Sequence, residues 1–130
     1  MEQLSSAVNQ ELNGIFGQAA VLTDPGDCLP YGYDNSRRQA MPQAVVFASE
    51  RQQISQLLRL CSRENIYLIA RGRGTGTTGA TVPDGGGIVL SLERMNRILE
   101  IDPDNRLARV EPGVTNQALQ QAVAEHGFFW

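Results

Sequence analysis

The sequence predicts an α+β fold that begins with an α/β unit, and two patterns of apolar residues predict it. A short apolar stretch at 44–47, an amphipathic stretch at 50–63 and a second apolar stretch at 66–70 follow one another with the lengths of a strand, a helix and a strand. A helical connection of this length joins parallel strands. Two later apolar stretches, at 98–102 and 107–111, flank a Pro-Asp-Asn turn, which is typical of an antiparallel hairpin. The prediction is a βαβ unit in a small mixed sheet, with one helix before it and a β-hairpin and a helix after it.

The first 41 residues are expected to form one helix and one long loop. Apolar side chains recur at spacings of three and four over residues 2–16, which indicates an amphipathic helix; they are Leu4, Val8, Leu12 and Ile15. Residues 23–41 contain several Pro, Gly and Asn residues and no such periodicity, so we expect a loop there. Ser49 precedes the next amphipathic stretch and is expected to cap the helix over 50–63.

The second half of the chain is expected to contain one more strand and one more helix besides the hairpin. Apolar residues at 87–92 predict a third strand. Thr115 can cap a helix over 116–126, and Gly127 can end it. His126 then lies in the last helical turn, where the helix dipole favours a basic side chain, and we do not interpret it as a catalytic base.

Length and charge restrict the classes of ligand. The chain has 130 residues, which is the size of one domain, and its composition of 42% hydrophobic and 19% charged residues is that of a globular protein. The formal net charge is −3, which gives no general attraction to nucleic acid or to an anionic membrane. An anion site must therefore be built locally from a few residues, and we expect a small-molecule ligand.

The sequence is expected to belong to a cytoplasmic, metal-free protein. The first fifteen residues lack the basic and apolar regions of a signal peptide, and no apolar run approaches the length of about 20 residues that a membrane helix needs. Cys28 and Cys61 form no CxxC pair, and His126 is the only histidine, so ligands for a structural zinc site are lacking. Cys61 lies on the apolar stripe of its helix and is expected to be a core residue.

A glycine-rich segment directly after the second strand is the main candidate site. Its sequence is Arg71-Gly72-Arg73-Gly74-Thr75-Gly76-Thr77-Thr78-Gly79-Ala80. Glycines permit positive φ angles and let the main chain approach a ligand closely. Successive N–H groups in such a turn form an anion-binding concavity, and threonine hydroxyls add donors. A phosphate or pyrophosphate is the expected ligand, with Arg71 and Arg73 either supplying local positive charge or lying solvated beside the turn.

Two common phosphate-binding motifs do not fit this segment. A Walker A loop needs Gly-Lys-Ser/Thr, but the chain has Gly76-Thr77-Thr78 and no lysine nearby. The spacing of Gly74, Gly76 and Gly79 formally matches the GxGxxG fingerprint of dinucleotide-binding folds. In that fingerprint a helix opens at the last glycine, whereas here Pro83 and three further glycines favour an extended loop that returns to a strand. The phosphate is therefore expected to meet main-chain amides without a strong helix dipole behind it.

Three separated blocks, at 70–83, 86–98 and 110–114, resemble the FAD-binding (PCMH-type) domain of the vanillyl-alcohol-oxidase flavoprotein superfamily. Within that superfamily the sequence is most similar to the group of the glycolate oxidase D subunit and D-lactate dehydrogenase. The resemblance covers about residues 42–130, with weaker support over the first helix and the loop at 31–34. The three blocks occur in the family's order, which makes the resemblance specific.

The resemblance implies a domain organisation. Residues 1–41 form an N-terminal helix and loop, and residues 42–130 form the first part of a two-subdomain FAD-binding domain. The rest of the second subdomain and the cap or catalytic domain are expected to follow beyond this sequence. The cluster Phe128-Phe129-Trp130 at the C-terminus also favours a fragment, because a terminus usually ends in polar sequence.

The resemblance also implies which residues contact the cofactor. The loop at 71–76 wraps the FAD pyrophosphate, Gly79 and Ala80 lie near the flavin, and 112–114 line the adenosine or pyrophosphate side. Some relatives tether the flavin through a histidine at the position of Thr75, so FAD is expected to bind non-covalently here. The implied cofactor-binding residues are Arg71, Gly72, Arg73, Gly74, Thr75, Gly76, Gly79, Ala80, Ser91, Met95, Pro112, Gly113 and Val114.

The implied function is that of a flavin-dependent oxidoreductase. The full-length enzyme would oxidise a 2-hydroxy acid such as glycolate or D-lactate by hydride transfer to FAD, alone or with other subunits of an oxidase complex. This chain supplies cofactor contacts and no evident catalytic residue. Three alternatives stay open: an inactive fragment or partner subunit that binds a nucleotide pyrophosphate, a flavin reductase on the same fold, and an RNA-binding module that uses the Arg-Gly segment.

Overall fold

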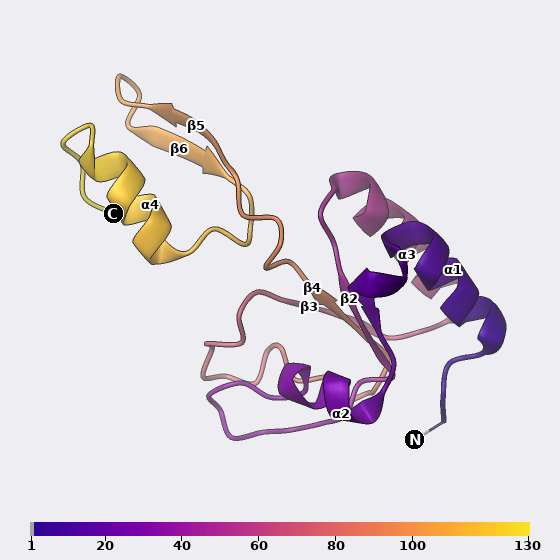
Figure 1. Ribbon diagram of the computed structural model, residues 1–130. Helices are drawn as coiled ribbons and strands as arrows, with labels where there is room; N and C mark the ends of the chain where they lie inside the picture. The colour runs from indigo at the N-terminus through magenta and orange to yellow at the C-terminus, as the bar shows by residue number, and fades with distance from the viewer. Residues whose placement is uncertain (1) are drawn as a thin grey trace.

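The computed structural model describes residues 2–130 and has the predicted α+β fold (Figure 1). Its helices and strands are α1 (Ser6–Phe16), β1 (Val21–Leu22), α2 (Pro25–Cys28), β2 (Ala44–Phe47), α3 (Arg51–Glu64), β3 (Leu68–Arg71), β4 (Ile88–Ser91), β5 (Ile98–Asp102), β6 (Leu107–Val110) and α4 (Asn116–Ala124). Two short 3-10 helices cover Gln18–Ala20 and Leu29–Tyr31. None of the helices in residues 2–130 is long and apolar enough to cross a lipid bilayer.

The main sheet has four strands in the order β1-β2-β4-β3. β4 runs parallel to both β2 and β3, and β1 runs antiparallel to β2, so the sheet is mixed as predicted. The βαβ unit of β2, α3 and β3 is confirmed, with β4 inserted between its two strands. Phe47 and Arg71, the last residues of β2 and β3, both lie opposite Ser91 at the end of β4. The three parallel strands therefore end together at one edge of the sheet, where the glycine-rich segment begins.

The two central strands and the helices α1 and α3 form the core. All eight residues of β2 and β4 are buried, which is the pattern of parallel strands covered on both faces. Leu12 of α1 and Leu57 and Leu60 of α3 are fully buried in the same cluster. The two helices lie side by side (Figure 1), and the Gln53 side chain donates a hydrogen bond to the carbonyl of Ile15 over 3.3 Å.

The ends of several elements differ from the prediction for local reasons. α1 begins at Ser6 and not at residue 2, because the Ser5 hydroxyl accepts a hydrogen bond from the amide of Val8 (3.2 Å) and caps the helix there. The N-cap of α3 is Glu50 and not Ser49, since Glu50 and Gln53 form a reciprocal capping box.

Boundaries also shift elsewhere in the fold. β3 covers residues 68–71, whereas the prediction was 66–70. α4 ends at residue 124, two residues before the predicted end at 126. The region at 23–41 contains α2 and a 3-10 helix within the expected loop, and the short strand β1 before it was not predicted.

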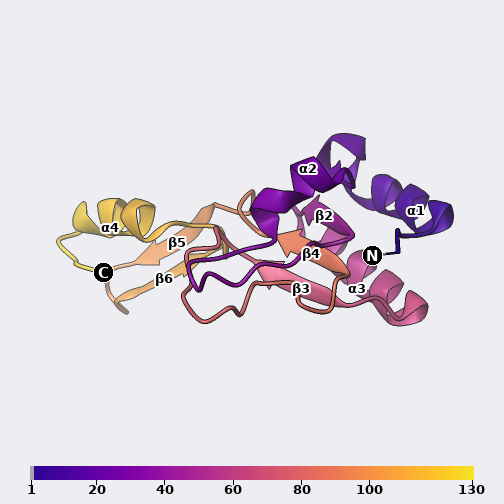
Figure 2. The same ribbon diagram turned by 90° about the horizontal axis from the view of Figure 1, so that it is seen from below.

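The hairpin β5–β6 and the helix α4 form the other end of the molecule (Figure 2). The Asp102 carboxylate accepts a hydrogen bond from the amide of Asn105 (3.1 Å), which closes the turn after Pro103. Arg106 completes this turn with a positive φ of 55°.

An ion pair between the residue before β5 and the residue after β6 closes the base of the hairpin. The Arg97 guanidinium donates to both carboxylate oxygens of Glu111 over 2.6 and 3.2 Å, and the amide of Arg97 donates to the same group over 2.9 Å. The Glu111 side chain is buried, whereas the Arg97 side chain is largely exposed. These hydrogen bonds from Arg97 hold the pKa of Glu111 below its ordinary value of 4.5.

Truncating α3 on its buried side tests the core. Leu57 is 0% exposed and the adjacent Leu58 is 53% exposed. Leu57→Ala is expected to lower the free energy of unfolding by about 2 to 5 kcal/mol, because it removes buried methyl groups and leaves a cavity. Urea unfolding followed by circular dichroism measures this change. Leu58→Ala is the matched control; an equal loss in both variants would contradict the packing described here.

Acid should weaken the ion pair at the base of the hairpin. Folding lowers the pKa of Glu111 from its ordinary value of 4.5. The ion pair therefore stabilises the fold fully at pH values above 4.5, and this stabilisation is lost as the pH falls through the lower pKa that Glu111 has in the folded protein. Glu111→Gln should therefore be less stable than the unmodified protein at neutral pH, with a difference that shrinks in acid. Urea unfolding between about pH 7 and pH 3 measures the difference. The exposed Glu125→Gln is the control, and a difference independent of pH would contradict the expectation.

Candidate functional site

The glycine-rich segment leaves the sheet at its carboxyl edge and forms no helix. Arg71 is the last residue of β3, and residues 72–87 form turns and bends that return directly to β4. The GxGxxG spacing therefore does not open a helix here, as predicted. The carboxyl edge of parallel strands is the usual position of ligand sites in α/β sheets.

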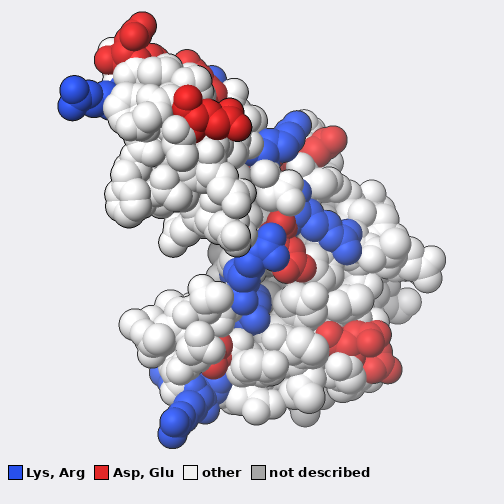
Figure 3. Space-filling model, turned by 60° about the vertical axis from the view of Figure 1, so that its left-hand side comes forward, with Lys and Arg blue, Asp and Glu red and all other residues white. Residues whose placement is uncertain are grey.

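A cavity of about 390 Å³ lies between this segment and the start of α4. It is lined by Gly72, Arg73, Thr75, Pro112, Gly113, Val114, Thr115, Asn116 and Gln117. Figure 3 shows a hollow between the two ends of the molecule, with basic side chains beside it; all of these are arginines, because the sequence has no lysine. The volume is within the range of about 300 to 1,000 Å³ that is usual for small-molecule sites.

The cavity brings together six of the thirteen residues singled out from the sequence, although its two walls are about forty positions apart in the chain. These six are Gly72, Arg73, Thr75, Pro112, Gly113 and Val114. Arg71, Gly74 and Gly76 belong to the same segment but do not line this cavity, and neither do Gly79 and Ala80. Ser91 and Met95 are buried and do not line it.

The main chain of the segment offers unused donors. Among the described residues, no acceptor is found for the backbone N–H groups from Gly72 to Thr78. Most residues of this stretch are exposed, and Gly74 has a positive φ of 68°. Free amides in a glycine-rich turn are the donor set that a phosphate or pyrophosphate requires. The residues present therefore fit the pyrophosphate group of a dinucleotide.

The N-terminus of α4 adds a second favourable feature that the sequence analysis did not anticipate. The Thr115 hydroxyl accepts a hydrogen bond from the amide of Ala118 (3.1 Å) and caps this helix of nine residues. Thr115, Asn116 and Gln117 line the cavity, so the positive end of the helix dipole faces it. The glycine-rich segment itself opens no helix, and the helix dipole that faces the cavity comes from α4, which is distant in the sequence.

The two arginines of the segment have different roles. Arg73 is exposed and lines the cavity, where its charge favours an anion. Arg71 is only 7% exposed, and its guanidinium donates to the carbonyls of Tyr33 (2.6 Å) and Pro30 (3.3 Å) and lies 5.6 Å from the centre of the Tyr31 ring. The Arg71 side chain is therefore a structural link, neither a solvated surface group nor part of an accessible Arg-Gly segment for RNA.

Two glycines are required by close contacts. A Cβ atom at Gly74 would overlap the Arg71 guanidinium, and one at Gly113 would overlap the carbonyl oxygen of Leu92. The amide of Gly113 also donates to the carbonyl of Met95 over 2.7 Å. Gly113 thus fixes one wall of the cavity against the turn that follows β4.

Asp34 and Asn35 are candidate site residues that sequence reasoning missed. Asp34 is 5% exposed, and its carboxylate accepts hydrogen bonds from the amides of Ser36 (2.8 Å) and Gly79 (3.0 Å). Hydrogen bonds from Ser36, then the Gly79 amide and the charge of Arg71, lower the pKa of Asp34, so this carboxylate is ionised at neutral pH. The Asp-x-Ser sequence indicates only the local turn, and no local signal points to a partner 45 positions away.

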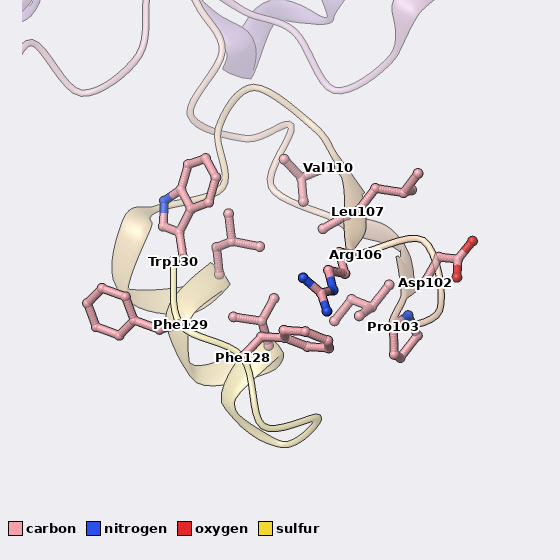
Figure 4. A pocket seen from close by; sticks show the side chains of 12 residues that line it. Asp102, Pro103, Arg106, Leu107, Val110, Phe128, Phe129 and Trp130 are labelled. Atoms are coloured by element: carbon pink, nitrogen blue, oxygen red, sulfur yellow. The ribbon is translucent and has the colours of Figure 1, made fainter.

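A second cavity, of about 420 Å³, lies between the hairpin and α4 (Figure 4). Phe128 points into it, while Phe129 points away and is 91% exposed. The Trp130 amide donates to the Gln120 side chain over 2.7 Å, so the last residues fold back along α4. The lining is mainly apolar, and its one basic side chain, Arg106, is accompanied by the carboxylate of Asp102, which disfavours a phosphate.

Comparison with known proteins shows the family to which the chain belongs. The family model described as an FAD binding domain matches residues 42–130. Glycolate oxidase subunit GlcD of Bacillus subtilis (strain 168) is 41% identical over 103 residues, which cover 78% of this chain and 22% of that protein. D-2-hydroxyglutarate dehydrogenase of Stutzerimonas stutzeri (strain A1501) is 32% identical over 125 residues, which cover 95% of this chain and 27% of that protein.

The fold is also similar to that of a solved enzyme structure. The crystal structure of p-cresol methylhydroxylase with substrate bound superimposes with a TM-score of 0.81 and 28% sequence identity, covering 93% of this chain and 24% of that chain. The chain thus spans about a quarter of the length of the proteins that it matches. It belongs to the FAD binding domain family of the vanillyl-alcohol-oxidase flavoproteins, which are flavin-dependent oxidoreductases, and its cofactor is FAD.

Proposed function

We propose that this chain binds the pyrophosphate of FAD in the cavity between the glycine-rich segment and the start of α4. The observation that carries the proposal is the run of free backbone N–H groups from Gly72 to Thr78. Gly72, Arg73 and Thr75 of this run line one wall of a cavity whose other wall holds a helix N-terminus. These amides and the dipole of α4 stabilise negative charge locally, so the protein as a whole does not need a positive net charge. Arg73 adds one full positive charge at the same cavity.

The remaining candidate residues are assigned by their position around this cavity. Pro112, Gly113 and Val114 form the opposite wall and are proposed to contact the pyrophosphate or adenosine. Gly79 and Ala80 lie further along the glycine-rich segment and are proposed to border the flavin. Ser91 and Met95 are buried, so we propose that they support the site from behind.

The proposed reaction is the oxidation of a 2-hydroxy acid of the glycolate or D-lactate type. Its support is that two similar proteins are named for glycolate and for D-2-hydroxyglutarate, both of which are 2-hydroxy acids. Bound FAD supplies the acceptor for the hydride of the substrate. The residues of this chain bind and orient the cofactor, and we assign no catalytic residue among them. Since one relative is named as a subunit, further subunits of an oxidase complex are proposed partners.

We propose a cytoplasmic location for the protein. Cys28 and Cys61 are both free thiols that are buried in the core. Burial raises the pKa of each thiol, so both stay protonated and unreactive. Unpaired cysteines of this kind are typical of reducing compartments.

A negative charge at Gly72 should weaken FAD binding. Gly72 lines the cavity, and a Cβ atom there would meet no atom within 4 Å, so Gly72→Asp adds a carboxylate without steric strain. Repulsion of the pyrophosphate is expected to reduce the affinity for FAD by at least about tenfold. Titration of the purified protein with FAD, followed by flavin fluorescence, measures the affinity.

The matched control is Gly14→Asp, which adds the same charge on α1 at another position where a Cβ atom is unhindered. It should bind FAD as tightly as the unmodified protein. Equal affinities in Gly72→Asp and Gly14→Asp would refute the placement of the pyrophosphate, and failure of the unmodified protein to bind FAD would refute the proposal as a whole.

FAD should be released when the protein unfolds. Position 75 is a threonine, whose hydroxyl can donate a hydrogen bond but forms no flavin tether. After acid precipitation of the FAD-loaded protein, all of the flavin is expected in the supernatant. Flavin fluorescence that stays with the protein band in a denaturing gel would show a covalent link and contradict this part of the proposal.

A further inference from the structure

We propose that the segment at 30–36, here called the bracket, sets the glycine-rich segment in its anion-binding conformation before the cofactor arrives, and that Asn35 is a positioning residue for the FAD pyrophosphate. The inference rests on the proposed function, because it concerns how the same site is built. It assigns a role to residues that line neither cavity.

Asn35 binds two successive carbonyl groups of the glycine-rich segment. Its backbone N–H donates to the carbonyl of Gly76 over 2.9 Å, and its side-chain amide donates to the carbonyl of Thr75 over 3.2 Å. Both carbonyls therefore point toward the bracket.

Because the peptide bond is planar and trans, the direction of these carbonyls also fixes the direction of the neighbouring N–H groups. In each peptide unit the C=O and the following N–H point in opposite directions. With the carbonyls of Thr75 and Gly76 directed at Asn35, the N–H groups of Gly76 and Thr77 point away from the bracket. Two successive N–H groups on one side of the chain are the donor arrangement of an anion-binding nest. Neither of them has an acceptor among the described residues.

The bracket also holds both ends of the segment. At its start, the Arg71 guanidinium donates to the carbonyls of Pro30 and Tyr33 and fills the space beside Gly74. At its end, the Asp34 carboxylate accepts the N–H of Gly79 over 3.0 Å. Asn35 acts between these two points, so the start, the middle and the end of the segment are each fixed by a hydrogen bond.

Fixing the segment in advance matters because glycines are conformationally free. A loop with four glycines between residues 72 and 79 loses much backbone entropy when it closes around a ligand. The bracket makes this ordering part of folding, so the binding free energy of the pyrophosphate is not spent on it. Removing one hydrogen bond of the bracket should therefore weaken pyrophosphate binding while leaving the rest of the fold intact.

The test is Asn35→Ala, which removes the side-chain donor to Thr75 and keeps the backbone N–H to Gly76. Asn105→Ala is the matched control: Asn105 is also exposed, and its side-chain amide also donates one hydrogen bond, to Asp102 over 2.7 Å, in the turn of the hairpin. The affinity of Asn35→Ala for FAD is expected to fall by about 3- to 10-fold, the effect of one hydrogen bond, and that of Asn105→Ala to stay unchanged.

A second readout separates positioning from general stability. The ³¹P resonances of bound FAD should move toward those of free FAD in Asn35→Ala, while the flavin absorption spectrum and the melting temperature match those of Asn105→Ala. Equal FAD affinities in the two variants would overturn the inference. A melting temperature lower in Asn35→Ala than in the control, or loss of its native circular dichroism, would assign Asn35 a merely structural role and overturn it as well.

The same series distinguishes this inference from the proposed function. If Gly72→Asp loses FAD affinity and Asn35→Ala does not, the pyrophosphate site stands and the role of the bracket falls. If Gly72→Asp binds FAD as tightly as the unmodified protein, the placement of the pyrophosphate falls and the inference falls with it.

Discussion

The Arg71 guanidinium links the parts of the molecule on which the candidate site depends. It stands at the end of β3, where the parallel strands terminate together, and it binds the carbonyls of Pro30 and Tyr33 in the segment between β1 and β2. Burying a charged group is unfavourable unless hydrogen bonds compensate it, and two carbonyls together with the face of the Tyr31 ring do so here. Because Gly74 leaves no Cβ atom in its way, the guanidinium fits directly beneath the loop. The sheet, the bracket and the glycine-rich segment are thereby held in one arrangement.

An acidic protein can bind a pyrophosphate because the attraction is local. The formal net charge of −3 opposes anions at long range, but screening at physiological ionic strength limits this effect to about 8 Å. At shorter range the cavity presents free amides, the N-terminus of α4 and the charge of Arg73. Main-chain donors carry no net charge, so a site built chiefly from them is compatible with the acidic surface.

Local patterns predicted most of the fold and the glycine-rich wall of the candidate cavity, whereas the opposite wall at 112–114 was named only from the family resemblance. The spacing of apolar residues predicted β2, α3, β3 and the hairpin, because an element that buries one face carries apolar residues at regular intervals. It missed β1, whose two residues are too few to show a pattern, and it could not place β4 between β2 and β3. The glycine-rich segment was recognisable because its residues are adjacent in the chain. The buried position of Arg71, the roles of Asp34 and Asn35 and the approach of α4 depend on partners about 40 positions away, for which one sequence carries no signal.

The position of the cavity between the two ends of the molecule makes its shape depend on a small junction. One wall belongs to the loop after β3 and the other to the residues that connect β6 with α4, so neither end contains the site alone. The walls are kept in register where the chain leaves β6: Glu111 is bound by Arg97, and Gly113 lies against the carbonyls of the turn at 92–95. Any side chain at position 113 would push the second wall away from the turn. The Gly113 contact therefore matters less for its own hydrogen bond than for the distance that it sets between the free amides of the loop and the N-terminus of α4.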